Sequence, residues 1–165
     1  MTTTEVKPIR DGFHSLTPYL SVPSADKMIE FLKKAFGAEL TFRGMRSDGS
    51  VMHTELKIGD SYLMMGEPAG NFPAMQSSIY LYVKDCDTVY SRAIKAGGVS
   101  LMEPETQPSG ERYGGVKDPA GNIWWVATHV EDVSKEEEAR RWKAVFQKRQ
   151  AKEELVPSTK ESTHP

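Results

Sequence analysis

The sequence has few of the features that would tie it to an extracellular, membrane or nucleic-acid setting. It contains a single cysteine, Cys86, so no disulfide can form within the chain. No apolar run is long enough to span a bilayer, and the N-terminal stretch lacks the apolar core of a secretory signal. The net charge of −2 gives no attraction to nucleic acid or to an anionic membrane. We therefore expect a cytoplasmic protein with no nucleic-acid or membrane partner.

The motifs of several common enzyme classes are also missing. There is no glycine-rich phosphate-binding loop and no Ser-His-Asp pattern in a recognisable context. Hydrophobic residues make up 38% of the chain and charged residues 27%, as expected for a globular protein. The 165 residues are enough for one domain with a core, or for two tightly joined halves.

One stretch of the chain occurs twice. The segment YLSVPSADKMIEFLKKAFGAEL (19–40) aligns without a gap with YLYVKDCDTVYSRAIKAGGVSL (80–101). Each copy has the pattern of a strand, a helix and a second strand. A repeat of this length indicates two structural units that bury their apolar faces together. We therefore expect the functional site to be built by both halves.

The first unit, residues 14–76, is predicted to be a βαβββ module. Alternating apolar and polar residues over 14–22 predict a strand. A helix follows, capped by Ser24 and ended by Gly37. Further strands are predicted at 39–46, 51–58 and 61–66. Residues 67–76, which contain two prolines and a glycine, are predicted to be the linker.

The second unit, residues 77–132, repeats this plan. Its helix is predicted to be capped by Asp85 and ended by Gly97 and Gly98. Strands are predicted at 77–83, 99–103, 111–117 and 122–128. The polar loop 104–110 is predicted to overhang a pocket.

The two ends of the chain lie outside the modules. Residues 1–13 are predicted to be a loose arm and residues 157–165 a disordered tail. Residues 133–156 are predicted to form a helix, because a capping box begins at Ser134 and acidic residues precede basic ones. This helix carries an apolar stripe, formed by Trp142, Val145 and Phe146. Such a stripe is stable mainly when buried, so we expect a homodimer whose interface includes or is crossed by this helix.

The tandem βαβββ pattern and the D-P-x-G-N turn at 118–122 resemble the vicinal oxygen chelate superfamily. That group includes glyoxalase I, extradiol dioxygenases, fosfomycin-resistance enzymes and bleomycin-binding proteins. The resemblance covers about residues 14–132. The segments TPYLSV, VMHTELKIGDSYLMM and DPAGNIWWVATHVEDVS, with the following EE-x-x-RR, resemble more narrowly its PhnB-like glyoxalase/bleomycin-resistance subgroup. The resemblance implies an α+β fold of two βαβββ modules, here with an added C-terminal helix, but it implies no single activity.

The resemblance also implies that helices cover one face of each sheet and that the other faces line a shared cavity. Strand alternation divides the side chains between these two faces. Under the helices we expect Leu20, Val22, Leu63, Met65, Ile79, Leu81, Val83, Trp124 and Val126. Toward the cavity we expect Thr17, Tyr19, Tyr62, Met64, Ser78, Tyr80, Tyr82, Ile123 and Trp125.

The usual metal site of these enzymes has no counterpart in this sequence. The resemblance places one His or Glu ligand on the first and last strand of each module. At those positions the chain has Thr17, Met64, Ser78 and Trp125. None of these side chains is a good ligand for a divalent cation. We therefore expect neither a metal at this site nor a cofactor.

Two residues on one predicted strand keep other possibilities open. His53 and Glu55 are two positions apart, so their side chains share a face. With Glu67 as a third ligand they would form a substitute metal site. The commoner role for such a pair is to orient a ligand by hydrogen bonds. A third possibility is a metal-free enzyme in which one of the two acts as general base.

The predicted function is a small-molecule-binding protein of the bleomycin-resistance kind that holds a planar or polar compound without the usual metal. The aromatic residues are predicted to form a cage or, alternatively, to be ordinary sheet aromatics. Arg112 is interpreted as a clamp for an anionic group or as a surface residue. The predicted ligand-binding residues are Tyr19, His53, Glu55, Tyr62, Met64, Tyr80, Tyr82, Arg112 and Trp125. The alternative function is a metal-dependent lyase, isomerase or dioxygenase of the same superfamily with a non-standard site.

Overall fold

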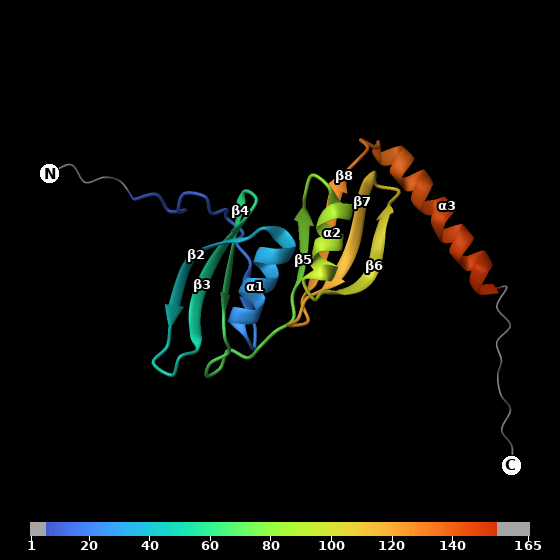
Figure 1. Cartoon of the computed structure of the whole chain (residues 1–165). Helices are drawn as coiled ribbons and strands as arrows, with labels where there is room; N and C mark the ends of the chain where they lie inside the picture. Colours follow the sequence, from blue (N-terminus) through green and yellow to red (C-terminus); the bar gives the residue numbers. More distant parts are fainter. Residues whose placement is uncertain (1–5, 155–165) are drawn as a thin grey trace, which may run out of the picture.

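The first module has the predicted βαβββ order in a computed structural model that describes residues 6–154 (Figure 1). Its elements are β1 (Tyr19–Ser21), α1 (Ala25–Phe36), β2 (Glu39–Met45), β3 (Val51–Ile58) and β4 (Ser61–Gly66). They form the first sheet, in the order β1-β4-β3-β2. β1 is parallel to β4, and the other pairs are antiparallel.

The second module repeats the first. Its elements are β5 (Ser78–Tyr82), α2 (Cys86–Lys95), β6 (Val99–Thr106), β7 (Glu111–Lys117) and β8 (Ile123–His129). The second sheet has the corresponding order β5-β8-β7-β6, again with a single parallel pair, β5 with β8. A last helix, α3 (Lys135–Glu154), follows. The predicted α+β fold of two tandem βαβββ modules with an added C-terminal helix is confirmed. The predicted tail, 157–165, lies outside the described residues.

Two strands differ in length from their predictions by three residues or more. The strand predicted at 14–22 is confined to β1, because Thr17 turns back to donate a hydrogen bond to the His14 carbonyl at 3.0 Å. In the second module β6 continues through Pro104 to Thr106 and takes up three of the seven residues of the predicted loop 104–110. Proline is tolerated there because β6 is an edge strand and its pairing is irregular between Met102 and Glu105.

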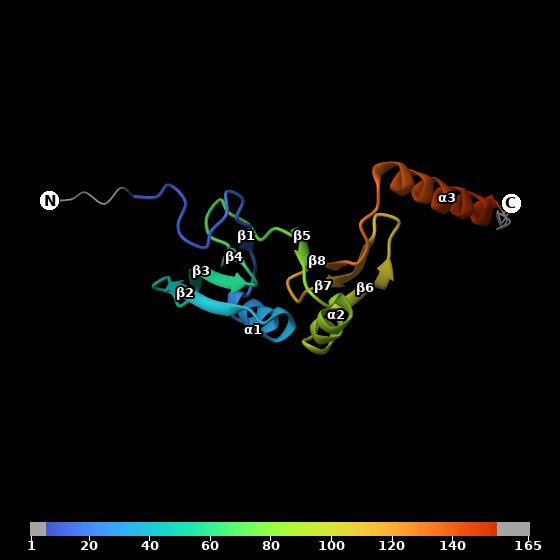
Figure 2. The same ribbon diagram turned by 90° about the horizontal axis from the view of Figure 1, so that it is seen from above.

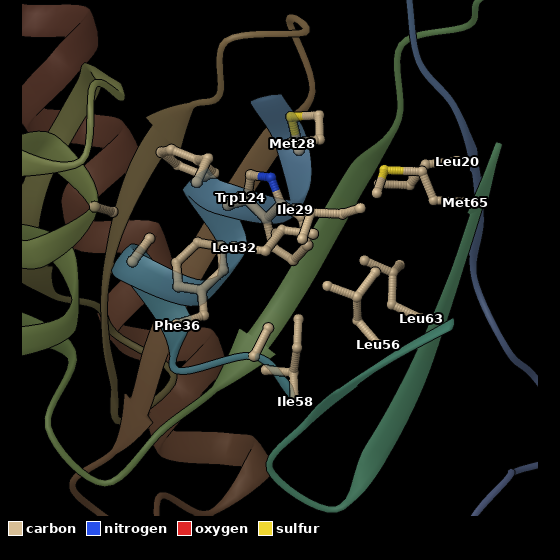
Figure 3. Close-up of a cluster of buried hydrophobic side chains, with 14 of the residues drawn as sticks. Leu20, Met28, Ile29, Leu32, Phe36, Leu56, Ile58, Leu63, Met65 and Trp124 are labelled. Atoms are coloured by element: carbon tan, nitrogen blue, oxygen red, sulfur yellow. The ribbon is translucent and has the colours of Figure 1, made fainter. Parts of the chain in front are cut away.

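Helices α1 and α2 lie on the same side of the two sheets and contact each other, so the modules share one core (Figures 1 and 2). At the centre the indole of Trp124 packs against the ring of Phe36, with centroids 4.7 Å apart (Figure 3). The residues predicted to lie under the helices are confirmed there. Six are buried, namely Leu20, Val22, Leu63, Met65, Trp124 and Val126; Ile79, Leu81 and Val83 are partly buried against the same core.

Helix α1 begins at the predicted residue but is capped by a different side chain. Ser24 is the N-cap residue, yet its hydroxyl makes no capping hydrogen bond. The Glu67 carboxylate accepts the amide of Ala25 at 2.9 Å and the amide of Val51 in β3 at 3.1 Å. Glu67 therefore joins the start of the helix to the sheet, and a carboxylate is favoured at that end of the helix dipole.

The turn between β7 and β8 is organised by one buried carboxylate. Asp118 accepts the backbone amides of Ala120 and Asn122, each at 2.9 Å, on one oxygen. Its other oxygen accepts the Asn122 side-chain amide at 2.8 Å and the Trp124 indole N–H at 2.9 Å. The D-P-x-G-N motif is thus a hydrogen-bonded unit that fixes the core tryptophan.

Helix α3 projects away from both sheets (Figure 1). Its predicted cap is confirmed, because the Ser134 hydroxyl accepts the Glu137 amide at 3.2 Å. Arg141 ties the helix to the preceding segment through two hydrogen bonds to Glu131, at 2.7 and 2.8 Å. Trp142 and Phe146 stack on one another with centroids 5.7 Å apart. Among the described helices, none has both the length and the apolar character to cross a membrane.

Candidate functional site

Each sheet has a face turned away from the helices, and these two faces carry exposed aromatic and apolar side chains. Their exposed fractions lie between 41% and 60% for Tyr19, Phe42, Tyr80, Tyr82 and Leu101. The expectation that one chain encloses these faces in a shared cavity is therefore not met. The chain instead presents a first open face, on the sheet β1-β4-β3-β2, and a second open face, on the sheet β5-β8-β7-β6.

The first open face brings together five of the predicted ligand-binding residues. Met64 pairs in register with Tyr19 on one side and Glu55 on the other, and Tyr62 precedes it by two positions on the same strand. His53 Nε2 lies 3.2 Å from Glu55 Oε1. The His53 ring stacks near Tyr19, with centroids 5.8 Å apart. The prediction that these residues share a face is confirmed.

Residues 6–13, the described part of the N-terminal arm, lie across this first open face rather than being loose. Arg10 Nη2 donates to Glu55 Oε1 at 2.7 Å, and this guanidinium holds the pKa of the Glu55 carboxyl below its usual range. Phe13 stacks on Tyr62 with centroids 4.1 Å apart and planes 11° apart. Sequence reasoning missed Arg10 and Phe13 because the Arg10–Glu55 contact joins residues 45 positions apart. No local pattern indicates such a contact.

The second open face is an aromatic cluster around a carboxylate. The Tyr80 hydroxyl donates to Glu111 Oε2 at 2.9 Å, and the Tyr82 hydroxyl donates to Oε1 at 2.5 Å. The Tyr113 ring lies edge-on to Tyr80 at 5.8 Å and to Trp125 at 5.9 Å. Burial first, and then the Glu111 carboxylate, raise the pKa of Tyr80; the hydrogen bond to Glu111 is the main cause that raises the pKa of Tyr82. Both phenols therefore stay neutral donors near neutral pH.

Glu111 is a site residue that sequence reasoning missed, although a signal for it exists. It stands two positions before Tyr113 on β7, so alternation places both side chains on the open face. The next residue, Arg112, lies on the opposite face for the same reason. There it forms two hydrogen bonds to Asp87 in the first turn of α2, at 2.6 and 2.7 Å. The structure thus separates Arg112 from the other predicted ligand-binding residues.

The four positions at which related enzymes carry metal ligands do not form a metal site. The Trp125 indole N–H donates to the Ser78 hydroxyl at 3.1 Å, so two of the four side chains bind each other. The Thr17 hydroxyl is bonded to a backbone carbonyl, and the remaining side chain is the thioether of Met64. Two hydroxyls, a thioether and an indole, which has no acceptor, do not fit a divalent cation.

The proposed substitute metal site is not assembled either. Glu67 is engaged by two backbone amides at the start of α1 and on β3, away from the His53–Glu55 pair. Among the side chains of residues 6–151, no three His, Cys, Asp or Glu converge as metal ligands would. His53 and Glu55 therefore form the hydrogen-bonded polar pair that was the other interpretation.

A groove of about 1090 Å³ runs between the two modules. From the first module it is lined by Leu16, Pro18 and Tyr62, among others. From the second it is lined by residues 79–84 and others. These include Tyr80 and Tyr82 of the open face together with the alternate residues that face the helices. Aromatic side chains of both open faces therefore border one continuous space, large enough for an organic molecule of ordinary drug size.

Residues 12–126 match the Glyoxalase/Bleomycin resistance protein/Dioxygenase superfamily. The chain belongs to this superfamily. Similar curated proteins include the uncharacterized proteins Mb0911c of Mycobacterium bovis and Rv0887c of Mycobacterium tuberculosis. Each is 31% identical over 134 residues, which is 74% of this chain and, respectively, 88% and 79% of the relative.

Solved structures of other proteins share the fold at lower identity. The crystal structure of TioX from Micromonospora sp. ML1 is 22% identical, with a TM-score of 0.60 over 71% of this chain and 99% of that one. The PhnB protein from Bacillus cereus is 20% identical, with a TM-score of 0.55 over 70% of this chain and 99% of that one. At this identity the likeness to these structures establishes the fold alone, and the function has to be argued from the side chains.

Proposed function

We propose that the protein binds a small planar or polar molecule non-covalently, on its aromatic open faces and in the groove between them, without the metal used by enzymes of the superfamily. The observation that carries this proposal is the bond between Trp125 and Ser78. At two positions where related enzymes carry metal ligands, this chain has the indole of Trp125 and the Ser78 hydroxyl that accepts its hydrogen bond. The indole therefore presents an aromatic surface in place of a metal site. The exposed rings of Tyr80 and Tyr82 extend that surface toward the groove.

Membership of the PhnB-like subgroup is part of the same proposal. Its support is the set of motifs TPYLSV, VMHTELKIGDSYLMM and DPAGNIWWVATHVEDVS. They contain six of the open-face residues, namely Tyr19, His53, Glu55, Tyr62, Met64 and Trp125. A cytoplasmic location also remains a prediction, and it rests on the single cysteine of the sequence, the buried Cys86.

A thermal-shift screen of planar aromatic compounds tests the proposed function. We expect at least one compound to raise the melting temperature equally with and without a metal chelator. Trp125→Ala should lower the affinity for that compound about tenfold or more, because stacking on an aromatic ring contributes about 1–3 kcal/mol to binding. Phe72→Ala, which removes an exposed ring from the linker 67–76, is the matched control and should leave the affinity unchanged. Binding that needs one zinc, nickel, manganese or iron ion per chain would contradict the proposal.

A homodimer is the second part of the proposal. The two open faces expose large aromatic groups, and contiguous apolar surface of this kind marks interaction sites. The apolar stripe on α3 is likewise not packed on its own sheets, and Phe146 is 54% exposed. A second copy of the chain is the partner that offers matching apolar surfaces, since a twofold interface pairs the same patches.

Removal of residues 134–165 should shift the protein toward monomer. The dimer dissociation constant is expected to rise about tenfold or more, because burying two large apolar side chains contributes a few kcal/mol. Sedimentation velocity over a concentration series measures this constant. Trp142→Ser with Phe146→Ser should reproduce the effect, and Gln147→Ser on the same exposed helix should not. A truncated chain with unchanged self-association would show that the helix plays no part in the interface.

A further inference from the structure

The N-terminal arm approaches the first open face closely enough to act as an occupant of it. Gly12 has a φ of +82°, and a Cβ at this position would lie 2.8 Å from the Tyr62 ring. A turn closed by the Phe13 amide and the Arg10 carbonyl, at 3.0 Å, presents both side chains to the sheet. The arm is therefore shaped to place one cation and one ring on this surface.

The two arm side chains form a single recognition unit. The Arg10 guanidinium lies 3.9 Å from the centroid of the Phe13 ring, a cation–π contact. From there it reaches Glu55, whose side chain is only 12% exposed, while Phe13 covers Tyr62. The surface beneath thus offers a nearly buried carboxylate beside an aromatic platform, and the arm fills both positions.

We propose that the first open face is a binding site for molecules that combine a guanidinium or similar cation with an aromatic ring, and that the arm occupies it until such a molecule displaces it. This rests on the proposed function, because Glu55 and Tyr62 belong to the same ligand-binding surface. It adds the ligand's chemistry and a competing segment of the chain itself.

The charge requirement follows from the burial of Glu55. A neutral ligand that displaced the arm would leave this carboxylate with His53 as its remaining polar partner in the described structure. Leaving a nearly buried charge without its cation is strongly unfavourable. A cationic ligand restores the ion pair, so displacement of the arm selects for positive charge.

The test uses the full chain and two probes of nearly the same shape, Nα-benzoyl-arginine amide and Nα-benzoyl-citrulline amide. The first carries a guanidinium cation, and the second carries a neutral ureido group in its place. In an Arg10→Gln, Phe13→Ala double variant the arm no longer competes. Isothermal titration calorimetry should then show benzoyl-arginine amide binding about tenfold or more tightly than to the original chain. Benzoyl-citrulline amide should show no such gain. Glu55→Gln added to the double variant should abolish it.

The matched control is Lys7→Gln, which removes a positive charge from the arm but pairs only with exposed Asp11. It should leave the affinity unchanged, and circular dichroism should show every variant folded. Equal gains for both probes, no gain, or weaker binding in the double variant would each overturn the proposal; the last result would make the arm part of the site. The arm is tested by comparing variants with one probe, whereas the proposed function is tested at Trp125, so either can fail alone.

Discussion

Truncation of Trp124 to alanine should lower the free energy of unfolding by about 3–5 kcal/mol, the range found for large aromatic residues in a packed core. Trp124 is 1% exposed and lies among Ile29, Leu32 and Phe36 under α1 (Figure 3). It belongs to module two but packs on the helix of module one. Its loss should therefore weaken the joint between the modules as well as the core.

The adjacent residue provides the matched comparison. Trp125 points to the open face and is only partly buried, so its truncation should cost about 1 kcal/mol and act mainly on ligand binding. Guanidinium denaturation followed by circular dichroism measures both variants. If Trp125→Ala were the more destabilising of the two, the assignment of faces on β8 would be wrong by one residue.

The architecture could be predicted because local sequence patterns indicate each strand and helix, and these patterns occur in both copies of the repeat. Alternation on the strands, helical spacing and the turn glycines agree in both copies, so each copy supports the interpretation of the other. At the end of each helix one glycine takes the left-handed conformation that glycine permits. It is Gly37 in the first copy, with a φ of +68°, and Gly97 in the second, with a φ of +105°. Faces of strands followed from the same alternation, which is why Trp124 and Trp125 could be assigned to opposite sides.

The site was predicted less completely because its key contacts are not local. Glu67 was considered as a metal ligand, but its carboxylate holds the amides that begin α1 and pair β3. Glu111 belongs to the site because it accepts hydrogen bonds from Tyr80 and Tyr82, which lie on a different strand. Arg112 was placed in the site by its charge, although alternation alone would have put it on the helix side with Asp87. The residue types in the sequence suggested which chemical groups could form a site. The contacts in the folded structure determine which of those groups lie together.

The second large effect is expected at Asp118. This side chain is 4% exposed and accepts four hydrogen bonds within the turn between β7 and β8. Asp118→Ala should lower the free energy of unfolding by about 3–5 kcal/mol, since it leaves several buried donors unpaired at once. The orphaned groups include the Asn122 amide and the Trp124 indole N–H, neither of which can reach water without opening the core.

Asp118→Asn separates the hydrogen bonds from the shape of the side chain. The asparagine oxygen can still accept the two backbone amides of the turn, but its NH₂ group would face the donors of Asn122 and Trp124. We expect a loss of about 2–3 kcal/mol, between the original chain and Asp118→Ala. Asp60→Ala, in the exposed turn between β3 and β4, is the control and should stay within about 0.5 kcal/mol. A loss below about 1 kcal/mol for Asp118→Ala would mean that the D-P-x-G-N turn keeps its shape without the carboxylate, and that packing alone holds Trp124 in place.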